Sequence, residues 1–294
     1  MKNFFRTDLA CESSNDLKHI EGTEYSFDEG RLYNIERLKI KTDKASERLG
    51  RSMGCYVTLS TPEIWPLDDD QISELSRPLA KELLGLLLHS CGVKSLTRDF
   101  SVLVVGLGNS SITADAIGPR SVEQITATRH VKAFSPEIFD HLGFCEVSAL
   151  IPGVLGKTGI ESAEIVLAAV KTVKPDAVII IDALAAGSIE RLARTVQLSD
   201  TGINPGAGIG NLRSELSFST LNVPVISIGV PTVVDSSTMV YDALMRSGFN
   251  EIPESMSEYL ERGAGYYVTP KETDLITEKV SKLISEAISL ALVI

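Results

Sequence analysis

The chain has 294 residues, of which 44% are hydrophobic and 23% are charged. This composition excludes a wholly disordered chain and is sufficient for a large buried core. The formal net charge of −11 argues against a standing nucleic-acid surface, which would need a basic face. The N-terminus lacks the apolar segment of a secretory signal, and the longest apolar run, at 287–294, is far shorter than the ~20 residues of a membrane span. We therefore expect a cytoplasmic protein that contacts neither nucleic acid nor membrane directly.

The first part of the chain predicts a peripheral arm followed by a strand and a helix. Residues 1 to about 52 are polar and charge-rich, with one expected strand near 32–40. A short strand is expected at 55–59. An acidic run at 68–70 then begins a helix through 79–87, whose leucines recur at helical intervals.

Strands and helices alternate from residue 101 onward. Residues 102–105 are a continuous apolar run, which is typical of a parallel strand buried on both faces. A helix is expected to begin at Gly118-Pro119, because proline is favoured at the first helical position, and to run toward residue 130. A strand at 146–151 and a helix capped by Thr158 follow.

The most hydrophobic strand, at 177–181, ends directly before an aspartate. An antiparallel strand is expected at 194–198 and another buried strand at 223–230. Helices are expected at 236–247 and 271–290. The alternation predicts a single α/β domain, a three-layer sandwich with a mostly parallel, partly mixed central sheet and helices on both faces.

Three aspartates follow strands of this sheet, at the edge where ligands bind in open α/β folds. Asp115 and Asp182 are each, when taken alone, more often structural, as backbone acceptors or helix caps. Together they indicate a catalytic pair, because two nearby carboxyl groups have pKa values driven apart, so that one activates water while the other protonates a leaving amine. We expect Asp235 to support this pair from outside, and the run Asp235-Ser236-Ser237 also fits a helix N-cap.

Other kinds of site have weaker support. Gly106 and Gly108 follow a strand, but a dinucleotide-binding fingerprint requires glycine at the position of Ser111. Ser110 and Ser111 lack the flanking pattern of a serine nucleophile. A metal-dependent hydrolase remains an alternative, because aspartates alone can hold Mg²⁺ or Mn²⁺. A catalytically silent binding protein on the same scaffold is a third possibility.

Histidine and cysteine add little to a metal site. The four histidines are expected on helices or outer segments, and the four cysteines form no C-x-x-C pair and are expected to be free thiols. These residues are His19, His89, His130, His141, Cys11, Cys55, Cys91 and Cys145.

Motifs along the whole chain, from Arg6 nearly to the C-terminus, strongly resemble the germination protease family of spore-forming bacteria. They occur in the same order as in that family. The residues that carry the resemblance are Val104-Val105-Gly106-Leu107-Gly108-Asn109, Thr113-Ala114-Asp115-Ala116-Ile117-Gly118-Pro119, Arg129-His130, Ile151-Pro152-Gly153-Val154, Thr158-Gly159-Ile160-Glu161, Ile181-Asp182-Ala183-Leu184-Ala185-Ala186, Asp200-Thr201-Gly202-Ile203 and Gly229-Val230-Pro231-Thr232-Val233-Val234-Asp235.

The resemblance implies an endopeptidase of the spore core that degrades small acid-soluble spore proteins during germination. It implies an atypical aspartic mechanism in which Asp115 and Asp182 are the catalytic residues, with no required cofactor, although a divalent metal is not excluded. It also implies a homotetramer. The core is similar to that of hydrogenase-maturation peptidases, in which acidic and histidine side chains bind nickel.

The resemblance further implies a zymogen that processes its own N-terminus. Arg6-Thr7-Asp8-Leu9-Ala10 is similar to the family's processing site, and we expect the cut between Asp8 and Leu9. Residues 1–8 would then be a propeptide and 9–294 a single peptidase domain, with 9–52 as its peripheral arm. Without the family resemblance, the residue pattern at 6–10 favours a frayed N-terminus of no functional consequence over a processing site. The chain departs from the family in having Ala114 before the first aspartate and a short segment at 248–266 in place of a long insertion.

Overall fold

The computed structural model describes residues 6–13, 17–204, 214–249, 254–263 and 265–294. Their strands form one sheet with the order β1-β2-β3-β7-β8-β6-β4-β5, and β9 pairs with the end of β8. The strands are β1 (Thr23–Glu29), β2 (Asn34–Ile40), β3 (Gly54–Ser60), β4 (Ser101–Gly106), β5 (Glu146–Leu150), β6 (Ala177–Ala186), β7 (Thr195–Ser199), β8 (Val225–Asp235) and β9 (Tyr267–Val268).

The sheet has a parallel part and an antiparallel part. β5, β4, β6 and β8 are parallel neighbours, whereas β1, β2, β3 and β7 continue the sheet from β8 as antiparallel strands. The antiparallel strand predicted at 194–198 is therefore confirmed as β7, which joins the two parts. The predicted peripheral arm contributes β1 and β2, so it extends the sheet itself.

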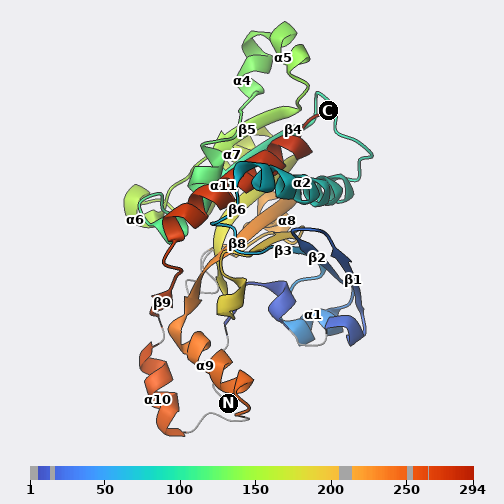
Figure 1. Ribbon diagram of the computed structural model, residues 1–294. Coiled ribbons are helices and arrows are strands. Elements are labelled where there is room, and N and C mark those ends of the chain that lie inside the picture. Colours follow the sequence, from blue (N-terminus) through green and yellow to red (C-terminus); the bar gives the residue numbers. More distant parts are fainter. Residues whose placement is uncertain (1–5, 14–16, 205–213, 250–253, 264) are drawn as a thin grey trace.

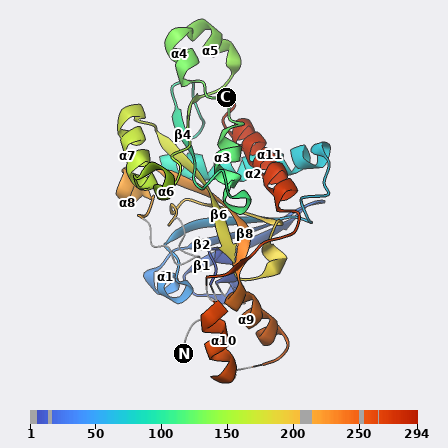
Figure 2. The same ribbon diagram turned by 90° about the vertical axis from the view of Figure 1, so that its left-hand side faces the viewer.

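Helices cover both faces of the sheet. Figure 2 shows α2, α3 and α11 on one side, with α7 and α8 on the other, which confirms the α/β sandwich. None of the described helices is both long enough and apolar enough to cross a bilayer. The helices are α1 (Asp43–Leu49), α2 (Asp69–Cys91), α3 (Ile117–Val122), α4 (Arg129–Phe134), α5 (Pro136–Leu142), α6 (Leu155–Thr158), α7 (Ser162–Val173), α8 (Phe218–Leu221), α9 (Ser236–Arg246), α10 (Glu254–Gly263) and α11 (Thr273–Ala291), with 3₁₀ turns η1 (Ala10–Glu12), η2 (Leu17–His19), η3 (Thr113–Asp115) and η4 (Ile189–Arg191).

Two helical hairpins project from opposite ends of the sandwich. α4 and α5 lie at one end, and α9 and α10 lie at the other (Figure 1). α10 occupies part of the segment at 248–266 that is short relative to the family.

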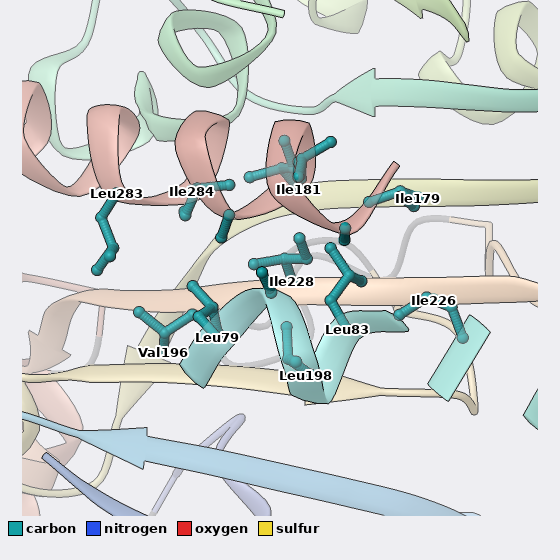
Figure 3. Packing of buried hydrophobic residues seen from close by; sticks show 14 of the residues in the cluster. Leu79, Leu83, Ile179, Ile181, Val196, Leu198, Ile226, Ile228, Leu283 and Ile284 are labelled. Carbon is teal, nitrogen blue, oxygen red and sulfur yellow. The ribbon is translucent and has the colours of Figure 1, made fainter. Parts of the chain in front are cut away.

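The main hydrophobic core lies between the sheet and the pair α2 and α11. Ile181 of β6 and Ile228 of β8 point toward these two helices, as do Val196 and Leu198 of β7 (Figure 3). α2 begins at a capping box in which the Asp68 carboxylate accepts the Gln71 N–H at 2.8 Å. The strand residues that alternate with these core residues must face the other side of the sheet.

On that other side, α7 and the N-terminal segment (residues 6–13) cover different parts of β6. Val166 and Val170 of α7 pack against Val178 and Ile180. Further along β6, the apolar cover comes from Leu9. The N-terminal segment is therefore a packed element, and the frayed terminus that the pattern alone favours is wrong for residues 6–13.

Several element boundaries differ from the predictions; β8, for example, continues to Asp235. β6 continues to Ala186 because its pairing with β8 extends past Asp182. α3 ends at Val122, because the following chain turns toward β5, where the Thr128 hydroxyl accepts the Val147 N–H at 2.9 Å. Thr158 ends α6 and does not cap the next helix, whose N-cap is Glu161.

Candidate active site

Asp182 lies within the central strand β6, whereas the sequence places it just after a strand. Its side chain is directed away from the α2–α11 core, because the preceding residue Ile181 points into that core (Figure 3). It is only 5% exposed, and its Oδ1 accepts the N–H of Ala183 at 3.0 Å. A buried carboxylate in a central strand carries a desolvation cost that an ordinary surface position avoids.

A row of three residues crosses the sheet at the level of Asp182. Asp182 pairs with Gly229 on β8, and Gly229 pairs with Gln197 on β7. All three face the side opposite α2 and α11, since their neighbours Ile228 and Leu198 point toward those helices (Figure 3). Adjacent strands lie ~4.8 Å apart, so the Cα atoms of Asp182 and Gln197 are separated by roughly 10 Å. The two polar side chains therefore flank a glycine on one face of the sheet.

Asp115 is brought to the same region by the turn after β4. It ends η3, which packs against β6 and β8, and its Oδ2 accepts the N–H of Asn109 at 2.8 Å. The turn is tight, because a Cβ on Gly108 (φ +115°) would lie 2.0 Å from the Asp115 carbonyl oxygen. Gly118 then packs on the backbone of β6 beside Ile181. The prediction that Asp115 and Asp182 act as a pair remains a prediction; η3, which carries Asp115, contacts β6, which carries Asp182.

Asp235 lies at a distance from this row. It is six residues beyond Gly229 along β8, which corresponds to roughly 20 Å of strand. It caps α9 by accepting the N–H groups of Ser237 and Thr238. Burial acts to raise the pKa of Asp235, but hydrogen bonds from Ser237, Gly265 and Thr238 outweigh it and lower the pKa below its usual value. The supporting role predicted for Asp235 remains a prediction, and the N-cap role is observed.

Within the described ranges, the three aspartates do not form a cluster of metal ligands. The cluster that does occur there consists of Cys55, His89 and Asp200, whose ligand atoms lie within 4.8 Å of one another. In this cluster the Asp200 carboxylate accepts the Cys55 N–H at 2.7 Å. Burial and the nearby Asp200 raise the pKa of the Cys55 thiol to about 11. All four cysteines are free.

The N-terminal segment is hydrogen-bonded to β6 and β7 on the face that carries Asp182. The N–H of Asp8 donates to the Ala185 carbonyl at 2.9 Å, and the N–H of Ala185 donates to the Asp8 carboxylate at 2.8 Å. Gln197 contacts the segment on both sides of Leu9. The bond predicted to be cut, Asp8–Leu9, is thus held against the sheet.

Leu9 anchors the segment. It is fully buried in a cluster with Leu184, Ala186, Leu192 and Val234. Burying a leucine side chain stabilises a structure by about 2 kcal/mol. Its backbone is extended, with φ −84° and ψ 127°.

Two hollows flank the docked segment. A cavity of about 140 Å³ is lined by Asp8, Leu184, Gln197 and Gly229 among others. A larger open hollow of about 980 Å³ lies beside Glu12, toward η4 and α9. The smaller one is lined by Gly229 and Gln197 of the row but not by Asp182 or Asp115, so it places the docked segment beside the row and does not itself contain the two aspartates.

Glu12, at the C-terminal side of the docked segment, links the segment to the chain after β6 through hydrogen bonds. Its Oε2 accepts hydrogen bonds from the Thr7 hydroxyl and, at 2.7 Å, from the Gly187 N–H. Burial raises the pKa of Glu12 above its usual 4.5, and the hydrogen bonds and Arg191 only partly offset that effect. Glu12 therefore retains its proton more readily in the folded chain than in the unfolded chain.

Replacing Glu12 by glutamine is expected to remove one component of the pH dependence of stability. Because the folded-state pKa is raised, the favourable effect of protonated Glu12 is complete below its unfolded value of 4.5 and is lost as the pH rises through the folded-state value. Glutamine remains neutral, so the Glu12→Gln variant should gain stability relative to the wild type across this rise. Urea unfolding of both proteins at a series of pH values measures the difference, and a difference independent of pH would contradict the expectation.

Sequence reasoning did not identify Gln197 or Arg51 as site residues. Gln197 had a local signal, because it is a polar residue between the apolar Val196 and Leu198 and so faces away from the core. Arg51 had none, since its contacts with Thr7 and Leu9 arise from the tertiary fold.

The comparisons with known proteins point to one family. The family model of the germination protease matches residues 5–247. Germination protease of Clostridium acetobutylicum is 39% identical over 99% of this chain and 95% of its own. That of Caldanaerobacter subterraneus is 40% identical over 98% and 94%, and that of Priestia megaterium is 42% identical over 81% and 66%.

Proposed function

The chain belongs to the germination protease family, and from this premise we propose that it is an endopeptidase that starts the degradation of small acid-soluble spore proteins. We propose further that it is made as a zymogen and cuts its own chain between Asp8 and Leu9. The protein is a peptidase by its family. The substrate, the self-processing and the residues below are the proposal.

One observation carries the proposal. The chain places its own acidic–apolar bond, Asp8–Leu9, between a bend at Asp8 and an extended Leu9, on the face of the sheet that carries Asp182. Peptides bound through main-chain hydrogen bonds and side-chain pockets use this arrangement. Here the main-chain partner is Ala185 and the pocket holds Leu9.

The proposed chemistry uses Asp115 and Asp182 as a coupled pair. One carboxylate takes a proton from water, whose oxygen adds to the carbonyl carbon of Asp8. The other carboxyl group, protonated beforehand, gives its proton to the nitrogen of Leu9 as the C–N bond breaks. The pair then holds one proton, as it did at the start, so no cofactor is required.

The sequence at the docked bond suggests the kind of substrate. Thr7, Asp8, Leu9 and Ala10 present a hydroxyl, an acid, a large apolar group and a small group in succession. We expect substrates to present the same succession in an extended segment. A homotetramer in the spore core is part of the proposal and follows from the family resemblance alone.

The proposal is tested with a purified small acid-soluble spore protein as substrate. We expect the wild type to cut it at few positions, each between an acidic and an apolar residue, as read by mass spectrometry of the products. Cutting at other residues, or none, would overturn the proposed specificity. Activity that survives a chelator supports the aspartate mechanism, whereas activity lost on chelation and restored by a divalent ion would support the metal alternative.

A further inference from the structure

Both the oxygen and the nitrogen of the Gln197 side-chain amide form hydrogen bonds with the N-terminal segment. The side chain is buried, with 7% exposure. Its Oε1 accepts the N–H of Ala10 at 2.6 Å, and its Nε2 donates to the carbonyl oxygen of Asp8 at 3.4 Å. That carbonyl belongs to the Asp8–Leu9 bond.

The orientation of this amide is fixed by its partners. The backbone N–H of Ala10 can only donate, so the oxygen of the Gln197 amide must face it. The nitrogen is then necessarily directed toward the Asp8 carbonyl. One short, unambiguous contact with Ala10 thus aims an N–H donor at the bond proposed to be cut.

Arg51 holds the main chain on either side of the same bond. Its Nη2 donates to the carbonyl oxygen of Thr7 at 2.7 Å and to that of Leu9 at 3.3 Å. Its Nε donates to the Ser13 hydroxyl at 3.1 Å. The contacts of Gln197 and the Nη2 contacts of Arg51 are with main-chain atoms, so they suit any peptide in this conformation.

We propose that Gln197 is a catalytic residue that stabilises the oxyanion of the scissile carbonyl, and that Arg51 is a positioning residue for the peptide main chain. This assignment rests on the proposed cut between Asp8 and Leu9. Gln197 faces the same side of the sheet as Asp182, and Gly229, with the Leu184 side chain packed over it, lies between them. In the proposed step, water activated at the aspartates adds to the carbonyl carbon of Asp8 while the carbonyl oxygen remains in contact with the Gln197 amide.

The length of the contact fits such a role. A donor that serves the transition state is aimed at the oxyanion and can be long in the ground state. When water adds, the carbonyl C=O becomes a C–O⁻ single bond and the oxygen gains a full charge. The Gln197 N–H then makes a charge-assisted hydrogen bond, which is stronger than the neutral one.

The test is the first-order rate of self-cleavage in the Gln197→Glu variant of the full-length chain. The introduced carboxylate can still accept the Ala10 N–H but has lost the donor to Asp8. We expect the rate to fall by about 10²–10³-fold, the typical cost of removing one oxyanion donor. The defect should shrink at low pH, where the new carboxyl group is protonated and can donate again.

Two measurements separate catalysis from folding. Gln71→Glu is the matched control, because glutamate is equally suited to its capping-box position and the rate should be unchanged. Amide hydrogen exchange at Ala10 reports whether the segment stays docked, and Gln197→Glu should keep its protection. Arg51→Lys, which keeps the charge but loses the planar fork, should reduce this protection as well as the rate.

The outcomes are distinct. Self-cleavage of Gln197→Glu within about threefold of the wild type would overturn the assignment while leaving the proposed function intact. A slow variant whose Ala10 exchanges freely would also overturn it, because the residue would then only hold the segment. A wild type that does not cut at Asp8–Leu9 would contradict the proposed function and this assignment together.

Discussion

Asp182→Asn is expected to leave the chain at full length, with self-cleavage slowed by at least about 10³-fold. General acid–base catalysis by a positioned carboxyl group contributes about 10²–10⁴-fold, and asparagine can neither accept the proton of water nor donate one to the leaving nitrogen. The side chain keeps its shape, so the Ala183 N–H retains an acceptor. Asp115→Asn should show a loss of the same order, because the two groups act as a unit.

A slower rate of self-cleavage must be distinguished from a loss of folded protein. Replacing a buried ionisable group by a neutral one should leave the melting temperature of Asp182→Asn at or above that of the wild type, since any desolvation cost of its charged form disappears. Asp68→Asn is the control, because asparagine is an equally good helix N-cap. Intact-mass measurements over a time course follow all variants. Processing of both site variants at the wild-type rate would end the two-aspartate hypothesis.

The second large effect is expected from adding one methyl group at Gly118. A Cβ there would lie 2.2 Å from the carbonyl oxygen of Leu107 and 2.7 Å from that of Ile181. Both are backbone atoms of neighbouring segments, so neither can move aside as a flexible side chain could. Gly118→Ala should destabilise the fold by about 3 kcal/mol, at the upper end of overpacking costs. It should also displace η3 and with it Asp115, so that self-cleavage slows even in the fraction that folds.

Gly156→Ala provides the matched comparison. A Cβ at Gly156 meets no atom within 4 Å, and the residue lies in the short helix α6, where alanine is favoured over glycine. Urea unfolding of both variants should give Gly156→Ala a free energy of unfolding within about 0.5 kcal/mol of that of the wild type. Equal stabilities for Gly118→Ala and Gly156→Ala would contradict the close packing of α3 on β4 and β6.

The parallel core of the fold could be predicted from the sequence because its strands are apolar on both faces. Residues 102–105 and 177–181 carry that signal directly, and the structure places them in β4 and β6. β1 has only two apolar residues, Tyr25 and Phe27, in alternation with polar ones, and most of its side chains are exposed, so the sequence analysis did not predict it. The end of β6 was misplaced because a charged residue usually ends a buried strand, whereas Asp182 continues to pair with β8.

The site was predictable only in part for a related reason. η3, which carries Asp115, contacts β6, but Asp182 lies within β6 and not beyond its end, so the rule that ligands bind beyond parallel strand ends does not describe its position. The contacts of the N-terminal segment depend on pairs such as Ala10 and Gln197, which are 187 residues apart in the sequence. No local pattern reports such a pair. At Asp235, by contrast, a local pattern was informative. The sequence predicted both a helix N-cap and a role in supporting the catalytic pair, and the structure shows the N-cap.

The most direct test of the account is the N-terminal sequence of the purified wild-type chain after incubation at mildly acidic pH. The account predicts a single new N-terminus that begins Leu9-Ala10-Cys11, together with the loss of residues 1–8 from the intact mass. A chain that keeps its original N-terminus, or one cut at another bond, would contradict it.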